Sequence, residues 1–152
     1  MSGARSNDES TSARPDTSAE QRTARRFGWT SLLGWASFGL VLEGAHAWKL
    51  GAVLDDELAR LLLRLGHAHG TVLALVVLAF SEAGAPLLRG DGDARLAGRL
   101  LRVAAVLVPF GFALSAVAHP EGDPNVLVFF VPAGALCLLA GLALVTRAAW
   151  RS

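Results

Sequence analysis

The chain contains a single cysteine, Cys137, and a single lysine, Lys49. One cysteine excludes a disulfide within the chain, so the cysteine content does not indicate a redox compartment. Cys137 lies inside an apolar run, where a free cysteine behaves as a small hydrophobic side chain. The 14 Lys and Arg residues almost balance the 13 Asp and Glu residues, and the net charge of +1 gives no electrostatic reason to expect a nucleic-acid partner.

Complete catalytic motifs are also absent from the sequence. The glycines do not follow the pattern of a phosphate-binding loop. No Ser–His–Asp arrangement is indicated, and Ser115, one helical turn before His119, is predicted to be a helix-packing serine. The sequence therefore does not predict catalysis by this chain on its own.

Apolar residues are what the sequence has in excess. They make up 53% of the chain, with a mean hydropathy of +0.44, which exceeds what an ordinary soluble domain carries. Four segments are long enough, at about 20 residues each, to cross a bilayer core as helices: residues 28–48, 57–88, 97–118 and 125–146. Short connections make sequence neighbours antiparallel, so we expect an all-α, up-down-up-down four-helix transmembrane bundle over residues 27–152.

Residues 1–26 contain no Leu, Ile, Val or aromatic side chain. Such a segment has too little apolar area to offset the entropy of ordering, so we expect a disordered cytoplasmic tail. A second interpretation concerns the segment that follows it. Ala45-His46-Ala47 resembles a small-x-small cleavage site, which leaves open that residues 28–48 are a cleaved signal peptide.

The basic residues predict the orientation of the bundle. Those assigned to one side are Arg22, Arg25, Arg26, Arg89, Arg95, Arg99, Arg102, Arg147 and Arg151. The other side has only Lys49, Arg60 and Arg64, together with acidic loops. The positive-inside rule then places both termini in the cytoplasm of a plasma (bacterial inner) membrane.

The four histidines converge on the opposite face, toward the periplasm or exterior. The predicted ligands of this layer are His46, His67, His69, His119 and Glu43. Glu43 and His46 have the i, i+3 spacing that places both on one helical face. Neutral imidazole is a common ligand of zinc, copper, iron and haem iron, and a carboxylate inside an apolar layer must be paired, protonated or ligating. We therefore expect a metal ion or haem in this layer.

His67 and His69 limit how such a site can be built. Residues two apart in a regular helix point about 200° away from each other. Either the helix only begins at Gly66 and Gly70, or the two imidazoles have different partners.

Two other functions remain open for the same residues. In a scaffold protein, the histidines would be a cofactor-free, hydrogen-bonded polar cap, with Glu43 paired to Lys49 or to a histidine. In a small transporter, Glu43 would be the proton-carrying group.

The His67-Ala68-His69 sequence is followed by Gly70 and an apolar run to Phe80. It resembles the start of a helix in small four-helix membrane proteins that are related to subunit one of haem–copper oxidases and nitric oxide reductases. In the large enzymes such histidines bind haem, so the resemblance implies haem ligation by His67 and His69. A looser resemblance to uncharacterised bacterial four-helix proteins with Glu-x-x-His on the first helix implies no activity. The expected partners are the lipid bilayer and other membrane subunits, in an accessory role to a respiratory or metal-handling complex.

Overall fold

The computed structural model describes residues 17–51, 55–88, 90–117, 119–120 and 122–151. These ranges are helical and contain no strand. The long helices are α1 (Thr17–Ala47), α3 (Glu57–Ala79), α5 (Asp91–Ser115) and α6 (Phe130–Ala149). A π-helical turn (Phe80–Gly84) joins α3 to the short α4 (Ala85–Leu87), and a 3₁₀ turn (Val126–Phe129) precedes α6.

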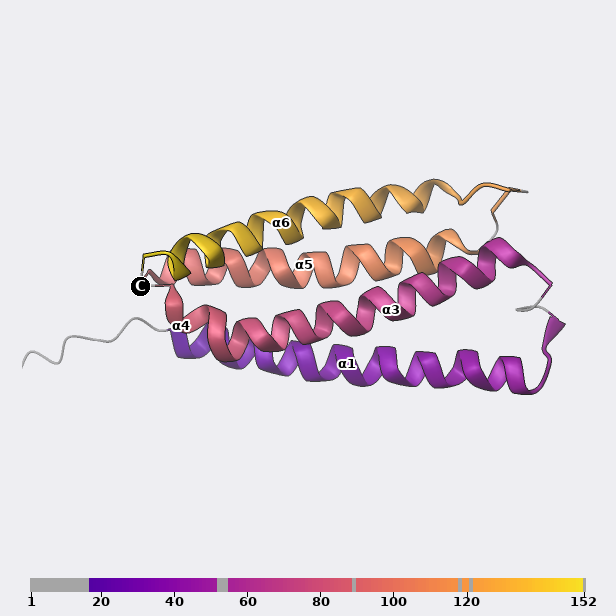
Figure 1. Cartoon of the computed structure of the whole chain (residues 1–152), viewed down its shortest axis with the longest axis horizontal. Helices are drawn as coiled ribbons and strands as arrows, with labels where there is room; N and C mark the ends of the chain where they lie inside the picture. The colour runs from indigo at the N-terminus through magenta and orange to yellow at the C-terminus, as the bar shows by residue number, and fades with distance from the viewer. Residues whose placement is uncertain (1–16, 52–54, 89, 118, 121, 152) are drawn as a thin grey trace, which may run out of the picture.

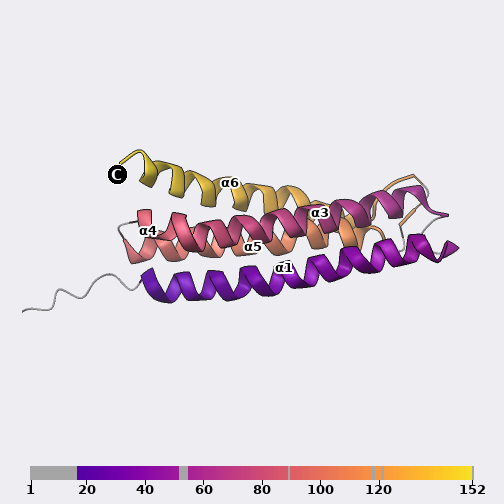
Figure 2. The same cartoon turned by 60° about the horizontal axis from the view of Figure 1, so that its bottom comes forward.

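The four long helices lie side by side, with α5 in a central position (Figures 1 and 2). α5 packs against α3 and α6, whereas α1 packs mainly against α3. The start of α1 and the end of α6 lie at one end of the molecule, here called the terminal end. The connections from α1 to α3 and from α5 to α6 lie at the other end, here called the histidine end because His46 and His119 are there.

Small residues allow the helices to approach closely. Ala97, Ala105 and Ala94 of α5 are fully or almost fully buried, and Gly141 of α6 lies against Leu101. The buried cluster consists of Ala24, Leu73, Val77, Phe80, Ala85, Leu88, Ala94, Ala97, Leu101, Ala105 and Val108. Close backbone approach at small residues is how helices associate where lipid, rather than water, surrounds them.

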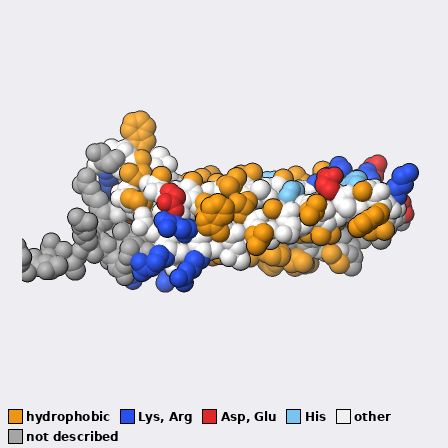
Figure 3. Space-filling model, turned by 90° about the horizontal axis from the view of Figure 1, so that it is seen from below, with side chains coloured by type: hydrophobic (Ala, Val, Ile, Leu, Met, Phe, Trp, Pro, Cys, Tyr) orange, Lys and Arg blue, Asp and Glu red, His pale blue; other side chains and the backbone are white. Residues whose placement is uncertain are grey.

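Large apolar side chains cover the outside of the molecule. Examples are Leu33, Leu40, Val72, Leu75, Val103, Leu136 and Leu139. Figure 3 shows one face, with basic side chains toward one end, hydrophobic side chains along the middle, and histidine beside charged side chains at the other end. This distribution is typical of a protein whose central band contacts acyl chains.

Three of the four predicted transmembrane segments are confirmed as long and apolar enough to cross a membrane: Glu57–Leu87, Gly92–Ser115 and Val126–Ala149. α1 is not among them. Its apolar half is interrupted by Ser, Thr and Gly residues and by Glu43 and His46, which lower its hydropathy.

The predicted boundary between a disordered tail and the helical domain, at residue 27, is wrong for residues 17–26. α1 begins at Thr17, so Thr17–Arg26 is helical rather than disordered. Ala24 is buried in the core, and Glu20 forms an ion pair with Arg102 of α5. Arg25 forms a second, exposed ion pair with Glu82, with a 2.8 Å Nε–Oε1 distance. Tertiary contacts therefore order a segment whose composition predicted disorder; residues 1–16 of the predicted tail lie outside the described residues.

α5 also begins earlier than expected, at Asp91 instead of residue 97. Its first turns are rich in Asp, Gly and Arg, which suggested a loop. Ala94 and Ala97 are both fully buried, so this polar stretch has one apolar face that packs on the core.

Candidate functional site

A pocket of about 320 Å³ lies between α1 and α3 toward the histidine end. Its lining residues are Ala36, Gly39, Leu42, Glu43, His46, Arg64, His67 and Thr71. Three of the five predicted ligands, Glu43, His46 and His67, therefore share this α1–α3 pocket.

His67 is held by the backbone of the neighbouring helix. Its Nδ1 lies 2.8 Å from the carbonyl oxygen of Trp35, and since a carbonyl only accepts, Nδ1 carries the hydrogen. Gly39 provides room for the ring, because a Cβ there would lie only 2.8 Å from both ring nitrogens. Nε2 is then left with its lone pair free, as no described residue bonds to it.

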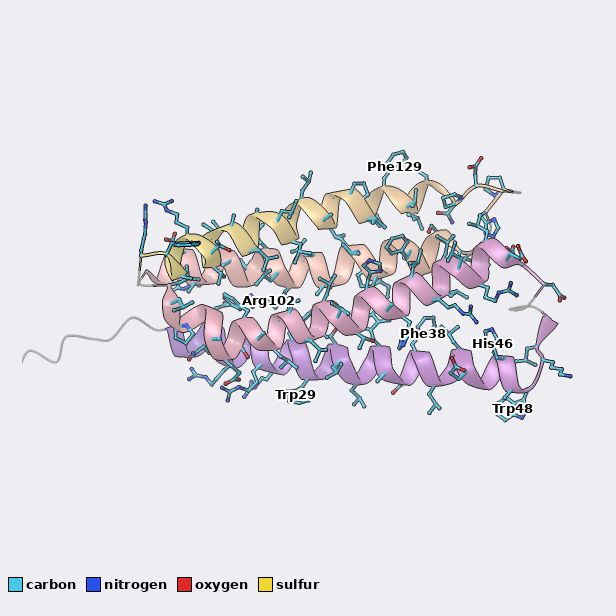
Figure 4. All side chains as sticks on the ribbon, in the orientation of Figure 1. Trp29, Phe38, His46, Trp48, Arg102 and Phe129 are labelled. Atoms are coloured by element: carbon cyan, nitrogen blue, oxygen red, sulfur yellow. The ribbon has the colours of Figure 1, made fainter. Side chains whose placement is uncertain are left out.

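His46 is engaged at both ring nitrogens. Nδ1 donates to the Leu42 carbonyl at 2.9 Å, and Nε2 lies 3.0 Å from an Nη2 of Arg64. A guanidinium can only donate, so Nε2 accepts and His46 is neutral. Figure 4 shows His46 near the end of α1, between that helix and α3. Arg64 therefore occupies the lone pair that a metal ion would need.

Glu43 lines the same pocket and is exposed. The structure gives it no ion pair with a described residue, so the proposed pairing with Lys49 is not observed in those ranges. Its carboxylate is free to act on whatever enters the pocket.

His69 faces away from the α1–α3 pocket. α3 is a regular helix from Glu57 to Ala79, so residues 67 and 69 point in nearly opposite directions. The His69 Nδ1 donates to the Leu65 carbonyl at 2.8 Å, and the ring lies 5.0 Å from that of Phe112 on α5. Of the two arrangements left open by the sequence, the one with different partners for the two imidazoles is observed.

His119 links the α5–α6 connection to the α1–α3 connection at the histidine end through a contact with Asp56, here called the His119–Asp56 pair. Its Nε2 lies 2.9 Å from Oδ2 of Asp56, and its Nδ1 lies 2.8 Å from the Pro120 carbonyl oxygen. Both nitrogens face acceptors, so this geometry fits a doubly protonated imidazolium. The other oxygen of Asp56 caps α3 by accepting from the Ala59 N–H at 2.9 Å. The His119–Asp56 pair therefore holds the α5–α6 connection against the start of α3.

The pKa of the Asp56 carboxyl is lowered from its ordinary value of 3.8. The main cause is the hydrogen bond from the Ala59 backbone, and the adjacent His119 adds to it. Because the folded-state pKa is the lower one, the contribution of ionised Asp56 is fully present above about pH 4 and is lost as the pH falls through the folded-state pKa.

We expect Asp56→Ala to loosen the start of α3, because the substitution removes both the cap and the partner of His119. Amide hydrogen exchange at Ala59 and the rest of the first turn should accelerate at neutral pH. The wild-type protein should approach the rate of the variant only in acid. Asp123→Asn, which changes an exposed loop carboxylate, is the control and should leave this exchange unchanged.

Within the part of the chain that the structure describes, no three His, Cys, Asp or Glu side chains lie close enough together to hold one metal ion as they stand. The four imidazoles of the predicted layer therefore lie in three environments. His46 and His67 line the α1–α3 pocket, His69 lies against Phe112, and His119 is in the His119–Asp56 pair. A metal ion in the pocket would require Arg64 to release His46.

The sequence interpretation missed the residues that position these imidazoles. Trp35, Gly39 and Arg64 lie around the pocket, and Asp56 holds His119. One signal was available: Trp35, Gly39, Leu42 and His46 recur at the three- and four-residue spacing of one helical face. That spacing marks the face of α1 that meets α3.

No protein-family model, no curated protein and no solved structure matches this chain. The resemblance of His67–Phe80 to haem–copper oxidase subunits therefore stays an expectation.

Proposed function

We propose that this chain is an integral membrane protein that crosses the bilayer four times, with both termini in the cytoplasm. We further propose that its α1–α3 pocket, near the exterior face, binds a transition-metal ion. His67 is the primary ligand, and Glu43 and His46 are further donors. The protein would act as an accessory to a respiratory or metal-handling complex.

The positions of charged contacts along α1 support its crossing. The Arg25–Glu82 ion pair lies toward the terminal end, and the His46–Arg64 hydrogen bond lies toward the histidine end. Roughly 21 residues separate Arg25 from His46, which at about 1.5 Å per residue is about 32 Å, close to the bilayer core. Because α1 runs alongside three helices that are apolar enough to span, it would share their depth in the membrane.

Interfacial aromatic residues agree with this placement. Trp29 lies on α1 and Trp48 follows the last residue of this helix, and both side chains are exposed (Figure 4). The two residues are about 19 positions apart, which is about 28 Å at about 1.5 Å per residue. The Trp ring favours the boundary between acyl chains and headgroups. The excess of arginine at the terminal end supports the cytoplasmic location of both termini.

The single observation that carries the metal proposal is the way His67 is held. A ligating histidine commonly donates its second ring nitrogen to a backbone carbonyl or carboxylate, which selects the tautomer and orients the ring. His67 already has this arrangement through Trp35, its Nε2 is free, and the residue lines a pocket that is also lined by a carboxylate and a second imidazole.

The donor set favours a free ion over haem in this pocket. Two imidazoles and one carboxylate suit zinc, iron, copper or nickel. The His67 ring lies directly against Gly39, so no slot for a porphyrin separates the two helices there.

The test is the metal and haem content of the purified full-length protein after expression and after titration with Zn²⁺, Fe²⁺ and Cu²⁺. We expect one ion per chain and a loss of affinity of at least about 100-fold in His67→Ala. His69→Ala is the matched control, because it removes an equally free imidazole from the same helix but outside the pocket. A protein with no bound metal, or an equal loss in both variants, would refute the proposal, and a Soret band lost in His67→Ala would assign haem instead.

A second variant tests the role of Arg64. Arg64→Gln removes a positive charge and frees Nε2 of His46, so metal affinity should rise by about 10-fold. Arg60→Gln, one turn earlier on α3 and outside the pocket, should leave the affinity unchanged. In a scaffold protein whose histidines only form a polar cap, neither substitution would create or strengthen metal binding. In a proton-coupled transporter, Glu43→Gln would abolish uptake in vesicles without affecting metal content.

A further inference from the structure

A second polar pocket, of about 270 Å³, lies at the terminal end. It is formed where α4 ends, α5 begins and α6 ends, which the views in Figures 1 and 2 place together. The α1–α3 pocket is near the opposite end of the molecule, so the two are separate. We call this second site the Arg147–Arg151 pocket.

Two guanidinium groups line the Arg147–Arg151 pocket. Arg147 is in the last turn of α6, and Arg151 is in the turn that follows the end of this helix at Ala149; both line the pocket. Both are exposed, and neither forms an ion pair with any residue that the structure describes. Paired guanidinium groups are well suited to phosphate oxygens, which they bind with several charge-assisted hydrogen bonds.

One carboxylate, that of Asp93 near the start of α5, lines the same pocket. It too has no ion-pair partner among the described residues. The pocket thus presents two positive groups from the C-terminal end of the described chain and a negative group from α5. A ligand that carries a phosphate and an ammonium group would satisfy all three.

The remaining walls are apolar. Leu87, Leu88 and Leu144 contribute to the lining, and Leu88 is almost completely buried. Trp150, which is 87% exposed, lies on the same turn of chain as the two arginines and is suited to the membrane interface. A ligand with a polar headgroup and an apolar body fits this combination better than a free phosphate does.

We propose that the Arg147–Arg151 pocket binds the phosphoethanolamine headgroup of a phospholipid of the cytoplasmic leaflet. Arg147 and Arg151 hold the phosphate, Asp93 accepts hydrogen bonds from the ammonium group, and the leucines contact the start of the lipid tails. The proposal rests on the membrane crossing of α6 in the proposed function, but it does not require metal binding.

The test uses the purified full-length protein in detergent, with lipid retention measured by native mass spectrometry and thermal stabilisation measured in parallel. Phosphatidylethanolamine should bind more tightly than phosphatidylglycerol, which lacks the ammonium group, or phosphatidylcholine, whose quaternary nitrogen has no hydrogen to donate. Arg147→Gln/Arg151→Gln should weaken phosphatidylethanolamine binding by about 30-fold. Asp93→Asn should remove the preference over phosphatidylglycerol.

Arg22→Gln/Arg26→Gln is the matched control, since it removes two exposed basic residues of α1 that do not line the pocket. It should leave phosphatidylethanolamine retention unchanged. Four results would overturn the proposal. They are equal retention of all three lipids, a preference for phosphatidylglycerol, binding of inorganic phosphate with an affinity equal to that for phosphatidylethanolamine, and equal losses of binding in both double variants. If alkaline carbonate releases the wild-type protein from membranes, then the proposed membrane placement is wrong, whatever the lipid measurements say of the pocket.

Discussion

Replacing Gly70 with valine is expected to cause a large loss of stability, because this glycine is where α3 admits the indole ring of Trp35. A Cβ at position 70 would lie 2.5 Å from Cγ of Trp35, and the ring cannot retreat easily. Trp35 is 8% exposed and has Phe110 of α5 on another side, with ring centroids 5.3 Å apart. The substitution must therefore separate α1 from α3 or displace Trp35 into Phe110.

The expected cost of this overpacking is about 3 kcal/mol. For a chain of this size that corresponds to a fall of about 10 °C in the Tm, measured by thermal unfolding in detergent. The loss should include the Trp35–His67 contact, since the Trp35 carbonyl is the acceptor for the His67 Nδ1.

Ala68→Val is the matched control for Gly70→Val. It places the same β-branched side chain in the same helix, two residues away, at an exposed position. Its cost should stay below about 1 kcal/mol, the difference in helix propensity. Equal Tm losses in the two variants would contradict the close approach of α1 and α3 at Gly70.

Arg102→Met is expected to be the second strongly destabilising substitution. Glu20 and Arg102 form an ion pair in which the two side chains are only 8% and 16% exposed, with Gly98 leaving room for the Glu20 carboxylate. Figure 4 shows Arg102 extending from α5 toward the start of α1. Removing the guanidinium leaves a buried carboxylate without its partner, which costs about 3 to 5 kcal/mol.

The double variant Glu20→Leu/Arg102→Met should recover most of that loss, because two apolar side chains can replace a buried ion pair at little cost. Arg25→Gln is the matched control, because it removes the arginine of a second ion pair that α1 makes. Its pair with Glu82 is 50% and 61% exposed, so its loss should be at most about 1 kcal/mol. Thermal unfolding of the four proteins in detergent measures these differences, and equal costs for Arg102→Met and Arg25→Gln would contradict the burial of the Glu20–Arg102 pair.

Hydropathy and length, which are local properties of the chain, predict the helical class, three spanning segments and the approximate ends of α6. They do not predict where α1 and α5 begin. Thr17–Arg26 lacks large aliphatic residues, and its helix depends on contacts with the π-helical turn after α3 and with α5, both of which are distant in sequence. Likewise, the polar start of α5 is helical because Ala94 and Ala97 are buried against other elements.

Sequence periodicity was similarly informative for only part of the candidate site. The i, i+3 spacing correctly indicated that Glu43 and His46 belong on one face, and both line the α1–α3 pocket. No local pattern could show that Arg64 reaches His46 or that Asp56 holds His119, since each pair joins residues from different elements.

By itself the sequence determined that this protein is helical, that it is rich in apolar residues, and that Glu43 and His46 share one helical face, because these are properties of composition and of spacing within one segment. Only the tertiary structure decided which imidazoles line the α1–α3 pocket. The rotation of α3 about its own axis, set by the entry of Trp35 at Gly70 and of His67 at Gly39, directs His67 to α1 and His69 to α5. That rotation depends on the packing of two helices against each other, which no single segment encodes.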